Sequence, residues 1–139
     1  MFGEEDGLAE FTLFTQFAFD QTFYPPLPVC EFRLRTSTGQ ESELLTGILD
    51  TGADATIIPT RVLQQINARR SFESTLRSQW GERRRVFLYL VDIQIAQILL
   101  PSIYAVGDEQ GDEIVIGRDV LNRLRIGLDG PKGMTRITP

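Results

Sequence analysis

The sequence predicts an all-β domain, built as one small, closed, barrel-like sheet with one short helix near its C-terminal end. Short segments in which every second residue is apolar recur along the chain, which is the pattern of half-buried strands. Turn-forming residues separate these segments. Only residues 118–123 have a clear helical pattern, and the length of 139 residues suits one domain with its own core.

The composition narrows the functions that the chain can perform. It has no histidine, which excludes Ser-His and Cys-His catalysis and removes the commonest metal ligand. Cys30 is the only cysteine, so neither an intrachain disulfide nor a cysteine-based zinc site can form. The net charge of −5 argues against nucleic acid as a partner. We therefore expect no metal, no cofactor and no nucleic acid.

Three features bear on where the protein is located. No apolar stretch is long enough to span a membrane. The N-terminal residues Met1–Asp6 are acidic, whereas a signal peptide begins with basic residues. A single free, buried thiol suits a reducing compartment. The sequence therefore predicts a soluble, cytoplasmic protein.

The first residues alternate between polar and apolar side chains. One parity holds Phe11, Leu13, Thr15, Phe17 and Phe19. This pattern predicts a strand that something must cover, because an unpaired aromatic strand promotes aggregation. It can pair within the domain, pair across a dimer, or be a pro-segment removed by self-cleavage, and we favour plain packing. The proline-rich hinge that follows separates an N-terminal extension, residues 1–24, from a domain of residues 25–139.

The rest of the chain is divided by its turn signals into further elements. Strands are expected, in chain order, at residues 29–35, 44–49, 55–58, 83–90, 91–95, 98–106 (a strand pair or one bent strand), 114–116, 124–129 and 134–137. The last of these is expected to be an edge strand. Pro59 suits a first helical position, so residues 59–66 should form a short helical turn.

The segment around Asp50 organises the others. The apolar run 44–49 leads directly into Asp50-Thr51-Gly52, and a β-branched run follows. We expect a buried strand that ends in a tight turn, with the Asp50 carboxylate held between apolar strands, where pKa values shift. Thr51 can form a local hydrogen bond, and Gly52 permits dihedral angles that other residues avoid. The simplest alternative is a plain turn capped by Asp50.

Two segments resemble motifs of the retropepsin-like family, the retroviral-type (clan AA) aspartic proteases. Residues 49–55, Leu-Asp-Thr-Gly-Ala-Asp-Ala, are similar to the active-site turn of that family. Residues 114–121, Ile-Val-Ile-Gly-Arg-Asp-Val-Leu, are similar to the segment before its helix. Asn122 and residues 128–131 are closer to the cellular, prokaryotic branch than to the viral enzymes. The resemblance covers roughly residues 25–129 and implies a small, closed acid-protease barrel.

The resemblance makes Asp50 the catalytic residue, supported by Thr51 and Gly52. Peptide hydrolysis by carboxylates needs two of them, one to take a proton from water and one to hydrogen-bond the scissile carbonyl. The chain has one Asp-Thr-Gly motif, so the second aspartate must belong to another copy, in a symmetric homodimer. Substrate backbone is expected at Gly52, Ala53 and Asp54.

The same family places a flap, a β-hairpin that closes over bound peptide, at residues 72–90. Gly81 is the expected tip. Trp80 contacts substrate or the opposing flap, or else folds back onto the core. The run of three arginines at residues 83–85 is expected to be a solvated face of the hairpin.

Residues near the helix are expected to have structural roles. In the family, the arginine that matches Arg118 pairs with the aspartate that matches Asp54, and Gly117 and Asp119 belong to the same segment. If this charge is buried, loss of its partner costs roughly 3–5 kcal/mol. The alternative is that Arg118 is an ordinary surface arginine.

Three functions remain open from the sequence. The leading hypothesis is a homodimeric aspartic endopeptidase that acts on peptides or proteins. The second is a non-catalytic dimerisation or peptide-binding module on the same fold, because fold alone does not decide function. The third is a monomer with a solvent-exposed Asp50 that has no role.

Overall fold

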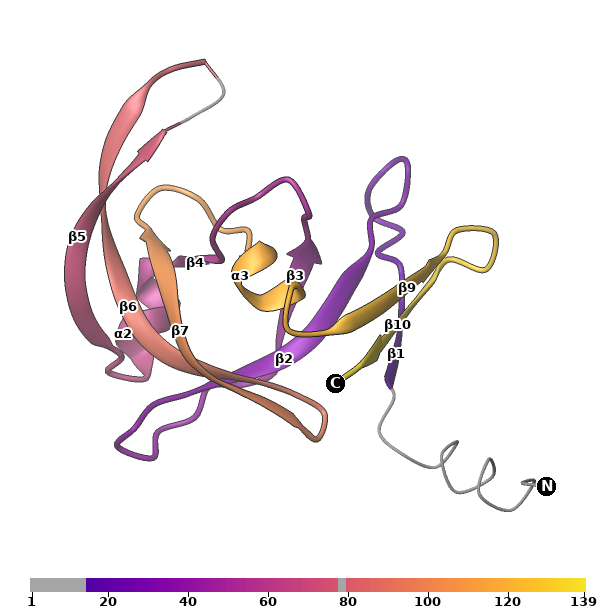
Figure 1. Ribbon diagram of the computed structural model, residues 1–139, viewed down its shortest axis with the longest axis horizontal. Coiled ribbons are helices and arrows are strands. Elements are labelled where there is room, and N and C mark those ends of the chain that lie inside the picture. The colour runs from indigo at the N-terminus through magenta and orange to yellow at the C-terminus, as the bar shows by residue number, and fades with distance from the viewer. Residues whose placement is uncertain (1–14, 78–79) are drawn as a thin grey trace.

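A computed structural model of the chain describes residues 15–77 and 80–139, and these are mostly in strands (Figure 1). The strands are β1 Thr15–Ala18, β2 Val29–Arg35, β3 Leu45–Leu49, β4 Ile57–Pro59, β5 Arg69–Arg77, β6 Arg83–Ile95, β7 Ile98–Asp108, β8 Val115–Ile116, β9 Arg125–Asp129 and β10 Met134–Thr138. Within the described ranges there are two helices, α2 Thr60–Gln65 and α3 Arg118–Leu121. The all-β fold class is confirmed.

The larger sheet returns on itself through β2. Its strand order is β2-β3-β8-β4-β7-β6-β5, and β2 also pairs with β6. Residues 29–32 of β2 pair with β3, whereas residues 33–35 pair with β6. Strand β2 therefore closes the sheet into a ring, because it pairs with β3 through its first half and with β6 through its second half. Strand β5 lies outside this ring and pairs with β6.

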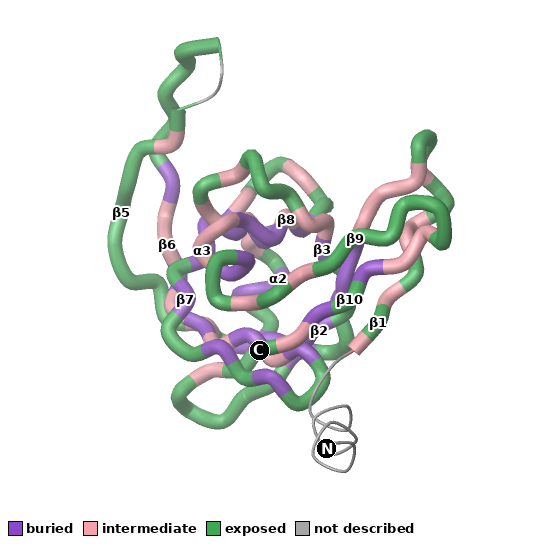
Figure 2. Tube along the Cα trace, turned by 45° about the vertical axis from the view of Figure 1, so that its right-hand side comes forward, coloured by how far each residue is buried: buried purple, intermediate pink, exposed green. Residues whose placement is uncertain are grey.

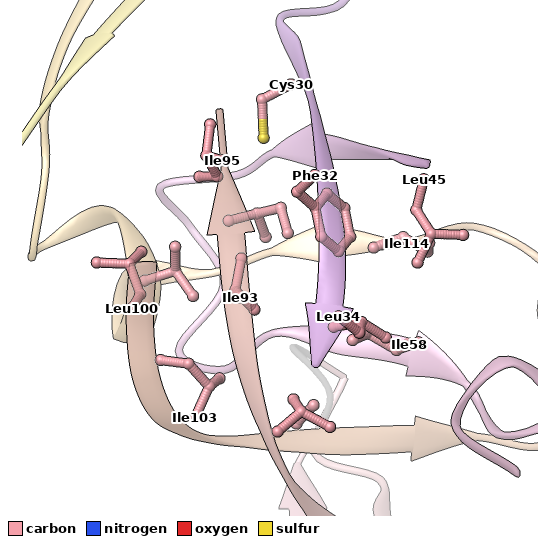
Figure 3. Close-up of a cluster of buried hydrophobic side chains, with 14 of the residues drawn as sticks. Cys30, Phe32, Leu34, Leu45, Ile58, Ile93, Ile95, Leu100, Ile103 and Ile114 are labelled. Atoms are coloured by element: carbon pink, nitrogen blue, oxygen red, sulfur yellow. The ribbon is translucent and has the colours of Figure 1, made fainter. Parts of the chain in front are cut away.

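The interior of this ring is the hydrophobic core, and Figure 3 shows side chains from β2, β4, β6 and β7 meeting in it. Cys30, Phe32 and Leu34 point inward from β2, as the alternation predicts, and each is at most 1% exposed. Burial raises the pKa of the Cys30 thiol to about 12, so the thiol stays protonated and unreactive at neutral pH.

A smaller, three-stranded sheet carries both ends of the described chain, in the order β1-β10-β9. Phe17 lies opposite Thr135, so β1 pairs within the chain, which is the first of the three alternatives for this segment. The prediction that β10 is an edge strand is wrong, because β1 occupies its other side. Phe11 and Leu13 lie outside the described residues.

Several boundaries differ from those expected. Residues 83–95 form one long strand, which keeps pairing with β7 through an irregularity between Val91 and Ile93. Pro59 is the N-cap of α2 and not its first residue, because its ψ of 134° is still extended. The strand before it begins at Ile57. Helix α3 ends at Leu121, two residues early. In residues 15–77 and 80–139, no helix is long and apolar enough to cross a membrane.

Candidate active site

The Asp50 turn begins where β3 leaves the large sheet. Strand β3 runs parallel to β8, and the backbone N–H of Asp50 donates to the carbonyl of Ile116 at 3.0 Å. The N–H of Gly52 donates to Asp50 Oδ1 at 2.8 Å, and the N–H of Ala53 donates to the Asp50 carbonyl at 3.2 Å. The sequence thus folds into the tight turn that was predicted.

Two expectations about this turn need correction. The Asp50 side chain is exposed in the single chain, because Thr51 and Gly52 project with it beyond the end of β3. It is not held between apolar strands. Gly52 does not have a φ in the left-handed region, and an added Cβ would instead lie 3.1 Å from Asp50 Oδ1. Glycine is therefore favoured at position 52 because any side chain there would crowd the Asp50 carboxylate.

Helix α3 holds the turn from the side. The Arg118 guanidinium donates to the carbonyl of Thr51 at 2.8 Å and forms an ion pair with Asp54. Its backbone N–H also donates to the carbonyl of Ala53 at 2.9 Å. The predicted pair is therefore present. The side chains of Arg118 and Asp54 are, however, 42% and 86% exposed. Removing one partner should therefore cost less free energy than was expected for a buried charge.

A buried polar network lies beneath this ion pair. The Thr56 hydroxyl donates to Asp119 Oδ1 at 2.8 Å, and the Thr56 N–H donates to Oδ2 at 3.1 Å. The same hydroxyl accepts from the N–H of Gly117 at 3.1 Å. Thr56 is fully buried. The N–H groups of Thr56 and Gly117 and the Thr56 hydroxyl therefore all have acceptors, and these bonds tie the residue before β4 to α3.

At Gly117, the backbone directly before α3 passes close to the backbone of Ala55. A Cβ added there would lie 2.6 Å from the carbonyl carbon of Ala55 and 2.7 Å from its oxygen. Both are backbone atoms and cannot move aside. Only glycine fits at this position, which accounts for the structural role predicted for Gly117.

The expected flap is the hairpin of β5 and β6, which extends away from the barrel (Figure 1). Gly81 has a φ of +86°, as a turn at the tip requires. Trp80 is 81% exposed, so the alternative in which it packs on the core is wrong for the single chain. Arg85 pairs with Glu73 in an exposed contact, whereas Arg84 lies 3.9 Å from Asp108, whose side chain is only 19% exposed.

The sequence predicted that the Asp50 turn and the Arg118 segment belong to one site, but Thr56, which lies beside them, was not among the predicted residues. Asp50, Thr51, Asp54 and Arg118 lie together, whereas the flap residues lie on a separate hairpin. Thr56 was not recognised. The sequence feature that could have identified it is a threonine directly before an apolar run. A hydroxyl buried there needs a hydrogen-bond partner.

Comparison with known proteins identifies the class. A family model described as "gag-polyprotein putative aspartyl protease" matches residues 39–123. A crystal structure of a retropepsin-like aspartic protease from Rickettsia conorii is similar, with 16% identity and a TM-score of 0.52. That match covers 80% of this chain and 92% of the other. A search of curated proteins gave no match.

The fold and the turn therefore define a retropepsin-like aspartic protease. The chain belongs to the gag-polyprotein aspartyl protease family, whose model spans both the Asp50 turn and α3. The likeness to the Rickettsia enzyme concerns the fold alone. Among the described residues, no group of three acidic or cysteine side chains is placed to hold a metal ion.

Proposed function

We propose that this chain is an aspartic endopeptidase that works as a homodimer, with one Asp50 from each copy. When the two carboxylates meet, they share one proton, because both cannot readily ionise at contact distance. The ionised Asp50 takes a proton from water, which attacks the scissile carbonyl. The protonated Asp50 donates a hydrogen bond to that carbonyl oxygen. The Thr51 side chain of each copy forms a hydrogen bond across the two-fold axis and so holds the two turns together.

The observation that carries this proposal is the exposed carboxylate on a braced turn. Within the described part of the chain, Asp50 uses only Oδ1 in a hydrogen bond, to the N–H of Gly52. Oδ2 remains available to a water or to a second carboxylate. Thr51, Gly52 and Asp54 are exposed around it, as a surface that receives a second copy and a substrate must be.

Substrate binding is assigned to the same turn and to the flap. We place the substrate backbone against Gly52, Ala53 and Asp54, and the flap tip, Trp80 and Gly81, over it. The exposed indole of Trp80 supplies apolar surface that a bound peptide can cover. The buried Cys30 thiol agrees with a reducing, cytoplasmic location.

The second candidate is a non-catalytic dimerisation or peptide-binding module. One observation favours it: Asp50 Oδ1 caps its own turn, and a carboxylate is not needed for that bond. An asparagine would accept the same hydrogen bond through its amide oxygen. Asp50→Asn therefore removes the chemistry and keeps the turn, which makes it the variant that separates the two candidates.

The test is digestion of a diverse peptide mixture by the wild type and by Asp50→Asn, from acidic to neutral pH, followed by mass spectrometry. Cuts made only by the wild type are expected. If a dimeric wild type makes no cuts, the binding module is the better explanation. Equal thermal unfolding of the two proteins is the control for folding.

Mixing the two proteins tests whether the site is shared. After subunit exchange at equal amounts, about one quarter of the dimers carry two Asp50 side chains. Activity per wild-type chain should then fall by about half. Activity that stays proportional to the wild-type chain would show that each copy has its own complete site.

A further inference from the structure

We infer that the flap hairpin selects peptides with acidic side chains close to the scissile bond, and that Arg77 and Arg83 bind their carboxylates. This inference rests on the proposed function and deepens it, because it names the substrate class of the same site. It starts from the charge of the hairpin and from the side on which that charge lies.

The flap hairpin carries a charge opposite to that of the rest of the chain. Of the 14 basic residues of the chain, six lie in residues 69–85, against two of the 19 acidic residues. The remaining residues therefore hold eight basic and seventeen acidic side chains. Strand β5 is exposed along nearly its whole length, and Figure 2 shows it in green. The positive charge is therefore concentrated on the surface of one hairpin, where it attracts acidic groups.

The side of the hairpin that carries Arg83 continues into the barrel core. Tyr89 and Val91 of β6 belong to the core, and Phe87 packs against it. Every second residue of a strand points to the same side, so Arg85 and Arg83 extend this side beyond the barrel. We call it the inner face of the hairpin.

Arg77 of β5 also belongs to the inner face, because it lies directly opposite Arg83. Like charges in such a pair are destabilising. Within residues 15–77 and 80–139, neither guanidinium forms an ion pair or a hydrogen bond. The next arginine on this face, Arg85, is paired with Glu73. Two unpaired guanidinium groups side by side suit an anion, since each can bind a carboxylate through two parallel hydrogen bonds.

The other face of the hairpin differs in both respects. Arg84 points to that face and does have partners, because it donates to Gln110 Oε1 at 3.5 Å and lies 3.9 Å from Asp108. Apolar rings are found there as well, since Phe72 contacts Tyr104 of β7 with ring centroids 5.4 Å apart. A hairpin that selects apolar peptides would carry such groups on its inner face. Near the tip, the inner face instead offers unpaired positive charge.

The inner face is placed to meet a bound peptide. In Figure 1, the hairpin and the loop that follows β3, which contains Asp50, extend from the same end of the barrel. A peptide bound against residues 52–54 and beneath the hairpin therefore lies on the side of Arg77 and Arg83. A homodimer has two such hairpins related by symmetry. One acidic residue is therefore expected on each side of the scissile bond.

The first test is the cleavage preference. The residues that surround each cut in the peptide mixture are read by mass spectrometry, and Asp or Glu near the cut should be enriched about tenfold. Arg83→Glu should abolish this enrichment, because the new carboxylate pairs with Arg77 directly opposite. The matched control is Arg69→Glu, which makes the same change of charge on the other face, opposite Leu90. It should keep the preference.

The second test measures binding without cleavage, in the Asp50→Asn protein. The probes are two fluorescein-labelled peptides, Ala-Ala-Glu-Phe-Leu-Glu-Ala-Ala and the same peptide with Gln in place of Glu, followed by fluorescence anisotropy. The Glu peptide should bind about tenfold tighter, and added salt should reduce the difference. Arg83→Glu should remove the difference and Arg69→Glu should not. Both positions are exposed, so thermal unfolding of the two variants should be alike.

The outcomes separate the inference from the proposed function. Cuts that depend on Asp50 but show no acidic preference, or a preference unchanged by Arg83→Glu, overturn the inference and leave the protease. If no cuts depend on Asp50, the proposed function fails and the binding test decides. Tighter binding of the Glu peptide then supports acidic recognition by a binding module, whereas equal binding or no binding overturns it. A single-stranded DNA oligonucleotide that binds more tightly than the Glu peptide, and through Arg83, would also overturn it.

Discussion

The Asp50 turn and the flap hairpin are held in different ways. The turn donates a backbone hydrogen bond from Asp50 to β8 and accepts hydrogen bonds from Arg118 of α3, and the polar network around Thr56 lies next to it in the chain. The flap extends beyond the barrel, and the β5 strand is exposed along nearly its whole length. Its ion pair between Arg85 and Glu73 is on the surface, where such a pair contributes little.

From this difference we expect the braced turn to contribute more to stability than the flap does. Residues that brace the turn sit in contact with fixed backbone, so changes there should destabilise the fold. Residues of the flap contact solvent, so changes there should alter activity with little cost in stability. Four substitutions test this division.

Gly117→Ala should have the largest effect. The new Cβ would overlap the backbone of Ala55, so the start of α3 and the segment before β4 must separate. We expect a loss of about 3 kcal/mol in the free energy of unfolding, measured with denaturant. The control is Gly130→Ala, where an added Cβ meets no atom within 4 Å. Equal stability of the two variants would show that the contact relaxes easily.

Thr56→Val should have the next largest effect. It keeps the shape of the side chain but removes the hydroxyl between Asp119 and Gly117. The N–H of Gly117 is then left without its acceptor, and Asp119 Oδ1 loses one of its two hydrogen bonds and keeps the one from the N–H of Val120 at 3.0 Å. A loss of about 2 kcal/mol in unfolding free energy is expected. Thr56→Ser keeps the hydroxyl and should recover most of it. If valine is tolerated as well as serine, the network does not stabilise the turn.

Arg118→Ala should cost less, about 1–2 kcal/mol, because its ion pair is solvated while its hydrogen bond to Thr51 is charge-assisted. In the proposed homodimer the turn faces the second copy, so dimer affinity should fall as well. Arg118→Lys keeps the charge but not the two-pronged geometry and should be intermediate. Unchanged unfolding and unchanged sedimentation would leave Arg118 as an ordinary surface residue.

Trp80→Ala should have the smallest effect on stability, within about 0.5 kcal/mol, because the side chain is 81% exposed. Its kcat/KM on a peptide substrate should nevertheless fall by about tenfold or more, if the indole covers bound peptide. Leu99→Ala, an exposed apolar position at the opposite end of β6 and β7, should change neither quantity. A loss of stability in Trp80→Ala would contradict the division.

The fold class could be predicted because it depends on local patterns, and the same patterns indicated where the candidate site lies. The alternation of polar and apolar residues predicted the strands of the barrel. The Asp-Thr-Gly turn was predicted because an apolar strand stops directly before the Asp50 carboxylate. The ion pair between Arg118 and Asp54 followed from the family resemblance, and the structure contains it.

What could not be predicted depends on contacts between distant residues. The partner of Thr56 lies far along the chain in α3, and nothing near Thr56 in the sequence points to it. The central place of β10 depends on β1 at the other end of the chain. The exposure of Asp50 depends on where the sheet ends, which alternation does not reveal.

The parallel pair of β3 and β8 has a consequence for how the protein is made. Ile48 lies beside Val115, so β3 cannot complete its pairing until nearly the whole domain has left the ribosome. Contacts between such distant residues make folding slow. The carbonyl of Ile116 and the guanidinium of Arg118 reach the Asp50 turn only then. An unfinished chain therefore carries the Asp-Thr-Gly sequence without the support that positions its carboxylate.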